Sequence, residues 1–323
     1  MRIDLTDTDA SRIAAELVRG RRRVGSPAMG MVLTLIVVVD EKEADRALEA
    51  AAEASKEHPA RILGVIIGSR QPTSTVDAEI RIAAGTPGES VLLWLRGEVT
   101  EHSESVVLPL LLPDSPVVVW WPSRAPDDPA ADPLGALAQR RITDAAGVPR
   151  NKQLAMSTQC HAYSPGNTDL AWTRITLWRA MLASALDQYP AKVTAARVRA
   201  ERISPSADLL TAWLTARLKV DVDRGASRGP GITEVVLQTG DGEVRIERPD
   251  GRLAALTLPG QPERPVALKR RGISELLAEE LRRLDPDEVY EQTVASMVRI
   301  ETGDAKRAGG RANRAGGRAK KGG

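Results

Sequence analysis

The chain has 323 residues, enough for two domains of ordinary size. Hydrophobic residues make up 42% and charged residues 27%, a globular composition that excludes a disordered or fibrous protein. The formal net charge is only +2, and the longest largely apolar run, residues 28–39, is too short to span a bilayer, which excludes a membrane protein.

The first half of the chain predicts strands and helices in alternation. Residues 1–30 contain a short amphipathic helix, and the β-branched run 33–39 predicts a strand buried on both faces. A helix from residue 44, ended by His58 and Pro59, and a second buried strand at 62–67 complete a β-α-β unit. Further strands are expected at 76–82, 91–95, 117–121 and 141–144, with short helices near 103–108 and 134–140.

The second half predicts helices around an antiparallel sheet. One long helix is expected from Asn167 or Thr168, either of which can be its N-cap, to about Leu186. A strand at 193–198, a helix at 207–218 and a meander at 232–237, 244–246 and 253–258 follow, with Asp-Gly pairs at the turns. Helices are also expected at 273–284 and after a capping box at 285–288.

These elements indicate an α/β fold with two domains and two terminal segments. The first domain has a mostly parallel sheet with flanking helices, Rossmann-like or flavodoxin-like but without the dinucleotide fingerprint. The second is an α+β domain with an antiparallel meander. The expected ranges are an N-terminal helical segment at 1–30, the α/β domain at 31–165, the α+β domain at 166–302 and a basic tail at 303–323.

The tail at 303–323 carries seven basic residues and one acidic residue among Gly and Ala. Because it has no large apolar side chain, we expect it to be disordered. No aromatic residue lies between its charges, so we interpret it as a solvated terminus and not as a nucleic-acid-binding arm.

The chain lacks the motifs of common catalytic and cofactor sites. The turn after the first buried strand reads Asp-Glu-Lys-Glu-Ala at 40–44, where a dinucleotide-binding fold has glycines. The Gly-rich stretches 85–88 and 225–231 do not join a strand to a helix in the spacing that holds phosphate, so we interpret them as turns. Cys160 and His161 have no identifiable orienting partner. The sequence therefore predicts no catalytic residue, no cofactor and no metal site.

The densest set of Trp and Arg side chains lies between residues 169 and 179. On the expected helix, one face carries Asp169, Trp172, Thr176 and Arg179. Arg174 and Trp178 lie one turn apart and form a second Arg-Trp pair. Such side chains dominate protein-binding hot spots and can also bind a sugar or an anion; the alternative is a helix packed between domains around an internal ion pair. The candidate partner-binding residues are Asp169, Trp172, Arg174, Trp178 and Arg179, with Trp121 and Arg124 as the next candidate.

Four separated strings of the sequence are unusual. They are HPAR at 58–61, LLLPDSPVVVWWP at 110–122, DLAWTR at 169–174 followed by Trp178 and Arg179, and ELLAEELRRLDPDEVY at 275–290. Together they resemble the OpcA family, whose members are described as glucose-6-phosphate dehydrogenase assembly proteins. The resemblance spans about residues 33–290, and four such strings in the right order make it specific.

The resemblance implies a non-catalytic assembly or activator subunit. Its partner would be glucose-6-phosphate dehydrogenase, the enzyme that opens the oxidative pentose phosphate pathway, and it would promote the active oligomer of that enzyme. The lack of catalytic motifs agrees with this role. Relatives in photosynthetic bacteria are thought to respond to thioredoxin through several cysteines, a control that a single Cys160 does not support through an internal disulfide. No signal region follows residues 1–4, and we expect a cytoplasmic protein.

Two other functions compete with the assembly role. One is a sugar-phosphate-binding enzyme or sensor, in which Arg174 and Arg179 hold the anion. Activity of the isolated chain on sugar phosphates would support it. The other is nucleic-acid binding, which rests on the tail alone and would show a steep salt dependence that disappears when residues 303–323 are deleted.

Overall fold

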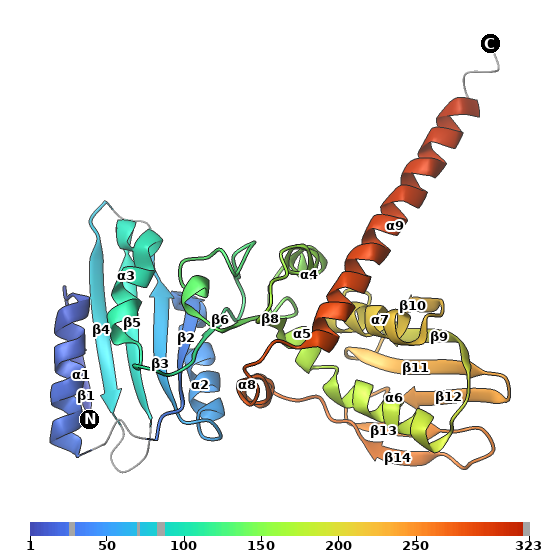
Figure 1. Cartoon of the computed structure of the whole chain (residues 1–323), viewed down its shortest axis with the longest axis horizontal. Helices are drawn as coiled ribbons and strands as arrows, with labels where there is room; N and C mark the ends of the chain where they lie inside the picture. Colours follow the sequence, from blue (N-terminus) through green and yellow to red (C-terminus); the bar gives the residue numbers. More distant parts are fainter. Residues whose placement is uncertain (26–29, 70–71, 83–87, 319–323) are drawn as a thin grey trace. The chain divides into compact units, whose positions relative to one another are not determined.

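The computed structural model describes residues 1–25, 30–69, 72–82 and 88–318, and for residues 304–318 it describes the backbone alone. The chain forms two compact units, each with its own sheet (Figure 1). Unit 1 contains Met1–Lys152, Ser164–Arg174 and Arg271–Asp287. Unit 2 contains Gln153–Tyr163, Ile175–Arg270 and the chain from Glu288 onward.

Unit 1 is built on an eight-stranded sheet in the order β1-β4-β5-β3-β2-β6-β7-β8 (Figure 1). The six strands from β5 to β8 in this order are parallel, whereas β4 pairs antiparallel with both β5 and β1. The strands are β1 (Arg2–Leu5), β2 (Leu33–Asp40), β3 (Ala60–Ile67), β4 (Thr75–Ile82), β5 (Glu89–Arg96), β6 (Val117–Trp120), β7 (Arg140–Thr143) and β8 (Asn167–Asp169).

Helices cover the two faces of this sheet, and each face has its own apolar core. One core joins the sheet to α1 and α3, and the other joins it to α2 and α8. The side chain of Asp9 caps the start of α1, and Gly25 ends it in the left-handed region at φ 64°. Gly20 of α1 allows close packing, because a Cβ there would lie 2.6 Å from Ile82. The helices are α1 (Ala10–Val24), α2 (Ala44–Ala54), α3 (Ser103–Val107), α5 (Leu170–Thr173) and α8 (Ile273–Leu281).

Unit 2 is built on a six-stranded sheet in the order β10-β9-β11-β12-β13-β14. All neighbouring strands are antiparallel except β10 and β9. Its strands are β9 (Val193–Ala200), β10 (Val222–Ala226), β11 (Ile232–Thr239), β12 (Gly242–Glu247), β13 (Leu253–Thr257) and β14 (Arg264–Ala267). Its helices are α4 (Lys152–His161), α6 (Thr176–Gln188), α7 (Pro205–Leu218) and α9 (Glu288–Arg318). The predicted fold class, a mostly parallel α/β sheet followed by an α+β part with a meander, is confirmed.

The segment after residue 166 differs from the single long helix that we expected. Residues 167–169 form β8, which pairs with β7, and the helical part is divided into α5 and α6. The cause is Asp169, whose side chain accepts a hydrogen bond from the amide of Ala171 and caps a new helix after the strand. The predicted placement of residues 169–179 on one helix is therefore wrong.

The compact units do not follow the expected domain ranges 31–165 and 166–302. Segments 164–174 and 271–287 belong to unit 1, and so does the expected N-terminal segment 1–30, in which β1 pairs with β4. Helix α8 explains the second segment, because Leu276, Leu277 and Leu281 are buried in the core beside α2. Helix α4 lies at 152–161, a stretch for which no helix was predicted.

Helix α9 is longer than expected. Its backbone is helical from Glu288 to Arg318, so it includes most of the segment 303–323 for which we expected disorder. Tyr290, Val294 and Met297 in its first turns are buried. Residues 319–323 lie outside the described residues.

Candidate partner-binding site

Asp169 lies at the junction of β8 and α5 and is fully buried. Its Oδ1 accepts a hydrogen bond from the amide of Ala171 (2.8 Å), and its Oδ2 accepts from Thr143 Oγ1 (2.6 Å) and from the amide of Ala145 (2.9 Å). Burial raises the pKa of Asp169 to about 6, and the nearby carboxylate of Asp144 adds to the rise, against the three hydrogen bonds. Asp169 therefore holds the β8–α5 junction together and does not face a partner.

Arg174 follows α5 and forms a bidentate ion pair with Asp144. Its Nη1 donates to Asp144 Oδ1 (2.6 Å) and its Nη2 to Oδ2 (2.9 Å). The Asp144 side chain is 0% exposed and that of Arg174 is 27% exposed. Burial alone would lower the pKa of Arg174, but the charge and hydrogen bonds of Asp144 raise it above its ordinary value. The guanidinium group already holds a carboxylate, so the predicted anion clamp of Arg174 and Arg179 is not formed.

Two of the unusual sequence strings meet beside α5. Thr173 Oγ1 donates to Glu280 Oε1 (2.6 Å), and Trp172 Nε1 donates to Asp287 Oδ2 (2.9 Å). Glu280 also accepts from Arg140 Nη2 (2.6 Å), which ties β7 to α8. Sequence reasoning missed Arg140 and Glu280, because partners 140 residues apart leave no local pattern.

Trp178 and Arg179 belong to α6 in unit 2. The indole of Trp178 is buried, and the guanidinium carbon of Arg248 lies 5.0 Å from its ring centroid. Arg248 donates to the carbonyls of Leu268 (2.7 Å) and Ile232 (3.0 Å), and burial, followed by the charge of Arg270, lowers the pKa of Arg248 to about 10. Arg179 is half-buried and donates to Thr176 Oγ1 (3.2 Å).

Trp121 and Arg124 follow β6 at the carboxyl edge of the sheet. Trp121 is buried in the core beside α1 and α3, whereas the side chain of Arg124 is 82% exposed. Arg124 Nε lies 3.6 Å from Asp40 Oδ2. Next to it, Ser123 Oγ donates a short hydrogen bond to the carboxylate of Glu43. These contacts join the loop after β6 to the loop after β2.

This edge of an open α/β sheet is where dinucleotides bind in related architectures. The favoured position lies between neighbouring strands whose connections leave in opposite directions, here β2 and β6. A 3₁₀ turn at Glu41–Glu43 follows β2 in place of a glycine loop, and the first turn of α2 carries Asp45. Carboxylates at a helix start repel a pyrophosphate.

Four of the seven candidate residues are buried, and the seven do not form one site. Unit 1 holds five of them and unit 2 holds Trp178 and Arg179. The candidates with exposed side-chain surface are Arg124, Arg174 and Arg179.

Other functional features are few within the described ranges. No three His, Cys, Asp or Glu side chains there lie close enough to hold a metal ion. Likewise, none of the described helices is both long enough and apolar enough to cross a membrane. Cys160 is buried, with its Sγ 3.7 Å from the sulfur atoms of Met156 and Met297.

Comparisons with solved structures gave distant likenesses. A mutant of KijD10, a 3-ketoreductase from Actinomadura kijaniata in complex with TDP-benzene and NADP, is 10% identical over 83% of this chain and 96% of that chain, with a TM-score of 0.46. An oxidoreductase from Sinorhizobium meliloti is 11% identical over 83% and 96% of the two chains, with a TM-score of 0.44. These values support no argument about chemistry. No curated protein sequence matches the chain.

Two family models match the chain in order. The model of the glucose-6-phosphate dehydrogenase subunit N-terminal domain matches residues 51–159, and the model of the corresponding C-terminal domain matches residues 165–294. The four unusual strings all lie inside these ranges. The chain belongs to the OpcA family of glucose-6-phosphate dehydrogenase assembly proteins.

Proposed function

We propose that the chain is a non-catalytic subunit that binds glucose-6-phosphate dehydrogenase and promotes its active oligomer. The observation that carries the proposal is the match of both domain models, in order, over residues 51–159 and 165–294. The turn after β2 supports it, because Glu41 and Glu43 stand where a dinucleotide-binding fold has glycines.

The first test is complex formation with the purified dehydrogenase. Size-exclusion chromatography with light scattering should show a complex that contains both proteins and a larger dehydrogenase oligomer than the enzyme forms alone. Dehydrogenase activity should rise when the chain is added and be absent from the chain by itself. Separate elution of the two proteins, with unchanged activity, would contradict the proposal.

The second test is cofactor binding by the isolated chain. Because carboxylates surround the start of α2, calorimetric titration with NADP or NAD should give no saturable heat at micromolar concentrations. Saturable binding of either cofactor would show that these carboxylates do not exclude a dinucleotide and that the chain is not purely an assembly subunit.

Among the candidate residues, we propose Arg124 as the strongest contact to the dehydrogenase. Its side chain is 82% exposed, its pair with Asp40 is long at 3.6 Å, and exposed arginines are frequent in binding hot spots. Arg124→Ala should weaken binding by on the order of 2 kcal/mol. Arg22→Ala, an exposed arginine of α1, is the matched control and should bind normally. Equal affinities for the two variants would place the contact elsewhere, with Arg179→Ala as the next variant.

A further inference from the structure

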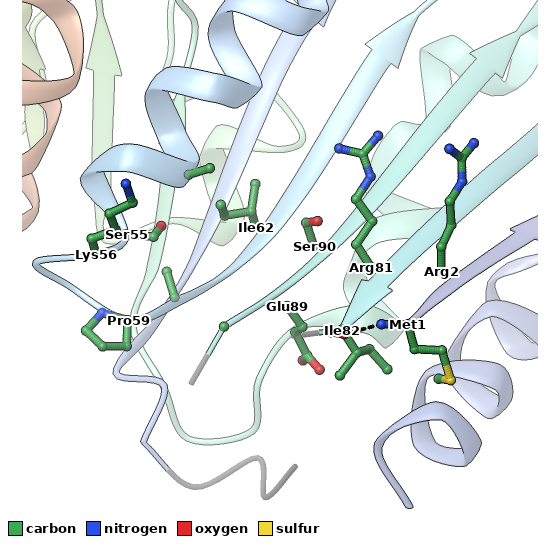
Figure 2. A pocket seen from close by; sticks show the side chains of 13 residues that line it. Met1, Arg2, Ser55, Lys56, Pro59, Ile62, Arg81, Ile82, Glu89 and Ser90 are labelled. Carbon is green, nitrogen blue, oxygen red and sulfur yellow. Dashed lines mark hydrogen bonds between the residues drawn. The ribbon is translucent and has the colours of Figure 1, made fainter. Parts of the chain in front are cut away.

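Unit 1 has a pocket of about 790 Å³ at the end of the sheet where the parallel strands β3 and β5 begin (Figure 2). This volume is within the range of small-molecule sites. Ser123 and Arg124 follow the carboxyl end of β6, so the pocket is separate from the loops that follow β2 and β6. The end of α2 forms one wall, and the strands β1, β4, β5 and β3 form the floor.

The strand register explains the shape and the chemistry of the floor. Arg2 of β1 is paired with Arg81 of β4, Arg81 with Ser90 of β5, and Ser90 with Ile62 of β3. These four side chains therefore stand in one row on one face of the sheet. Helix α2 packs on this face over β2 and β3, and the pocket opens where the helix ends, at Ser55.

The walls of the pocket are apolar on one side and cationic on the other. Pro59 and Ile62 lie on the side of α2, and the side chains of Arg2 and Arg81 extend next to each other from their strands (Figure 2). Lys56, just after α2, is a third cation and lies on the side of Pro59 (Figure 2). An apolar surface with several cations at its rim suits a small molecule that has an apolar body and an acidic group.

The cations at the rim retain hydrogen-bonding capacity. Arg2 pairs with both Asp4 and Glu79, and Arg81 contacts the same Glu79 carboxylate through Nε. In the described part of the chain, Nη1 and Nη2 of Arg81 have no hydrogen-bond partner, and its side chain is 54% exposed. The pair of Lys56 with Glu53 is fully on the surface, where ion pairs are weak and exchange readily.

The carboxylate of Glu89 at the pocket does not oppose an anion. Arg21 donates two hydrogen bonds to it, of 2.7 and 2.6 Å, and Arg61 donates a third. Two arginines thus neutralise one buried carboxylate. Around the pocket the cationic side chains outnumber the carboxylates that pair with them, which favours an anionic ligand.

We propose that this pocket binds a small organic anion, with its apolar body against Pro59 and Ile62 and its carboxylate or phosphate group at Arg81. Arginine suits both acidic groups because its guanidinium can donate two parallel hydrogen bonds. This ligand site is additional to the role in assembling the dehydrogenase and does not depend on it.

The test is calorimetric titration of the full chain with three probes of equal chain length. Octanoate and octyl phosphate carry the two acidic groups, and octylammonium is the matched cation. At least one of the anions should bind saturably and about ten-fold more tightly than octylammonium, and the comparison of the two anions identifies the preferred acidic group. No saturable binding of either anion, or equal binding of the cation, would overturn the proposal.

Variants locate the binding. Arg81→Gln should weaken binding of the preferred anion about ten-fold or more, because one charge-assisted contact is lost. Ser90→Leu should abolish it by filling the floor. Arg12→Gln, an exposed arginine of α1 on the other face of the sheet, is the control and should bind normally. Melting temperatures show whether each variant is folded. If folded Arg81→Gln binds as the unchanged chain does, or if Arg12→Gln loses as much affinity, the pocket is not the site.

Discussion

Arg174 and Arg124 have the same chemical group but different surroundings, and this difference determines what each can do. Arg174 holds the side chain of Asp144, which is 0% exposed, and Arg124 is 82% exposed. Removing the guanidinium of Arg174 leaves a buried carboxylate without its counter-charge, close to a second carboxylate at Asp169. We expect Arg174→Ala to lower the free energy of unfolding by about 1–3 kcal/mol.

Urea unfolding measures this difference, with Arg124→Ala as the control. Because the control removes only an exposed pair, its unfolding free energy should change by less than about 0.5 kcal/mol. If Arg174→Ala is as stable as the control, the ion pair with Asp144 contributes nothing and Arg174 is available for a partner.

Asp169 gives the stability of the chain a pH dependence of a defined sign. Its pKa in the folded chain, about 6, lies above its ordinary value of 3.8, so the folded chain holds the proton more tightly than the unfolded chain does. The stability from this proton is complete below about pH 4 and is lost as the pH rises through 6. Asp169→Asn cannot titrate. Between pH 4 and pH 7 the unfolding free energy of the unchanged chain should therefore fall, relative to the variant, by about 2–3 kcal/mol.

Urea unfolding of both proteins at several pH values checks this prediction. The hydrogen bonds lost in Asp169→Asn lower its stability by an amount that does not vary with pH, so only the change with pH counts. A constant difference between the two proteins would mean that Asp169 ionises normally.

The sequence patterns identified the candidate residues but could not predict what surrounds each side chain. Trp172 and Trp178 are scarce, large side chains among many Leu and Ala residues, which made them conspicuous. Both are buried, and each contacts a polar group distant in sequence: Trp172 donates to Asp287, and Arg248 lies over Trp178. Composition and spacing cannot show whether an indole faces a partner protein or a distant segment of its own chain.

Among the secondary-structure elements, the strands formed by long apolar runs were predicted correctly, whereas the short strand β8 and the capped helix α5 were not. Strands β2 and β3 are largely apolar runs rich in β-branched residues, a pattern typical of strands buried on both faces. The β8–α5 junction depends instead on one carboxylate, Asp169, that can cap a helix from within an apparently helical pattern. Strand β14, which has only four residues, carries no alternation that could have been recognised.

Helix α9 allows a prediction about where the stabilising part of the chain ends. Its last described side-chain contact to another helix is Glu301, which accepts a hydrogen bond from Ser157 of α4 (2.9 Å). Deleting residues 304–323 keeps this contact and should leave the melting temperature unchanged within about 1 °C. Deleting residues 300–323 removes it and should lower the melting temperature by about 2–4 °C, because a hydrogen bond to a charged group contributes about 1 kcal/mol or more.

Differential scanning calorimetry of the two truncated chains and the full chain checks this prediction. The comparison is between the two deletions, which differ in four residues. A clear loss of stability in the shorter deletion would show that residues 304–323 contribute contacts of their own.

Each compact unit of the molecule combines segments that are far apart in the sequence. The family models divide the chain between residues 159 and 165, close to the boundary expected from sequence, whereas unit 1 also includes residues 164–174 and 271–287. The later segment supplies α8, whose Leu276, Leu277 and Leu281 complete the core beside α2, and whose Glu280 pairs with Arg140. Pattern analysis could not assign α8 to unit 1, since an amphipathic helix does not identify the surface that it covers.

A fragment that ends at the sequence boundary should therefore be unstable. Residues 1–163 lack β8, α5 and α8, so the apolar side chains of α2 that pack against α8 would be exposed to water, and Arg140 would lose its buried partner. We expect this fragment to aggregate or to unfold at a far lower urea concentration than the full chain. A second fragment, residues 1–174 joined through a flexible Gly/Ser linker to residues 271–287, restores these contacts and should unfold cooperatively. Circular dichroism during urea titration compares the two. Cooperative unfolding of fragment 1–163 at the midpoint of the linked fragment would show that α8 is dispensable for unit 1.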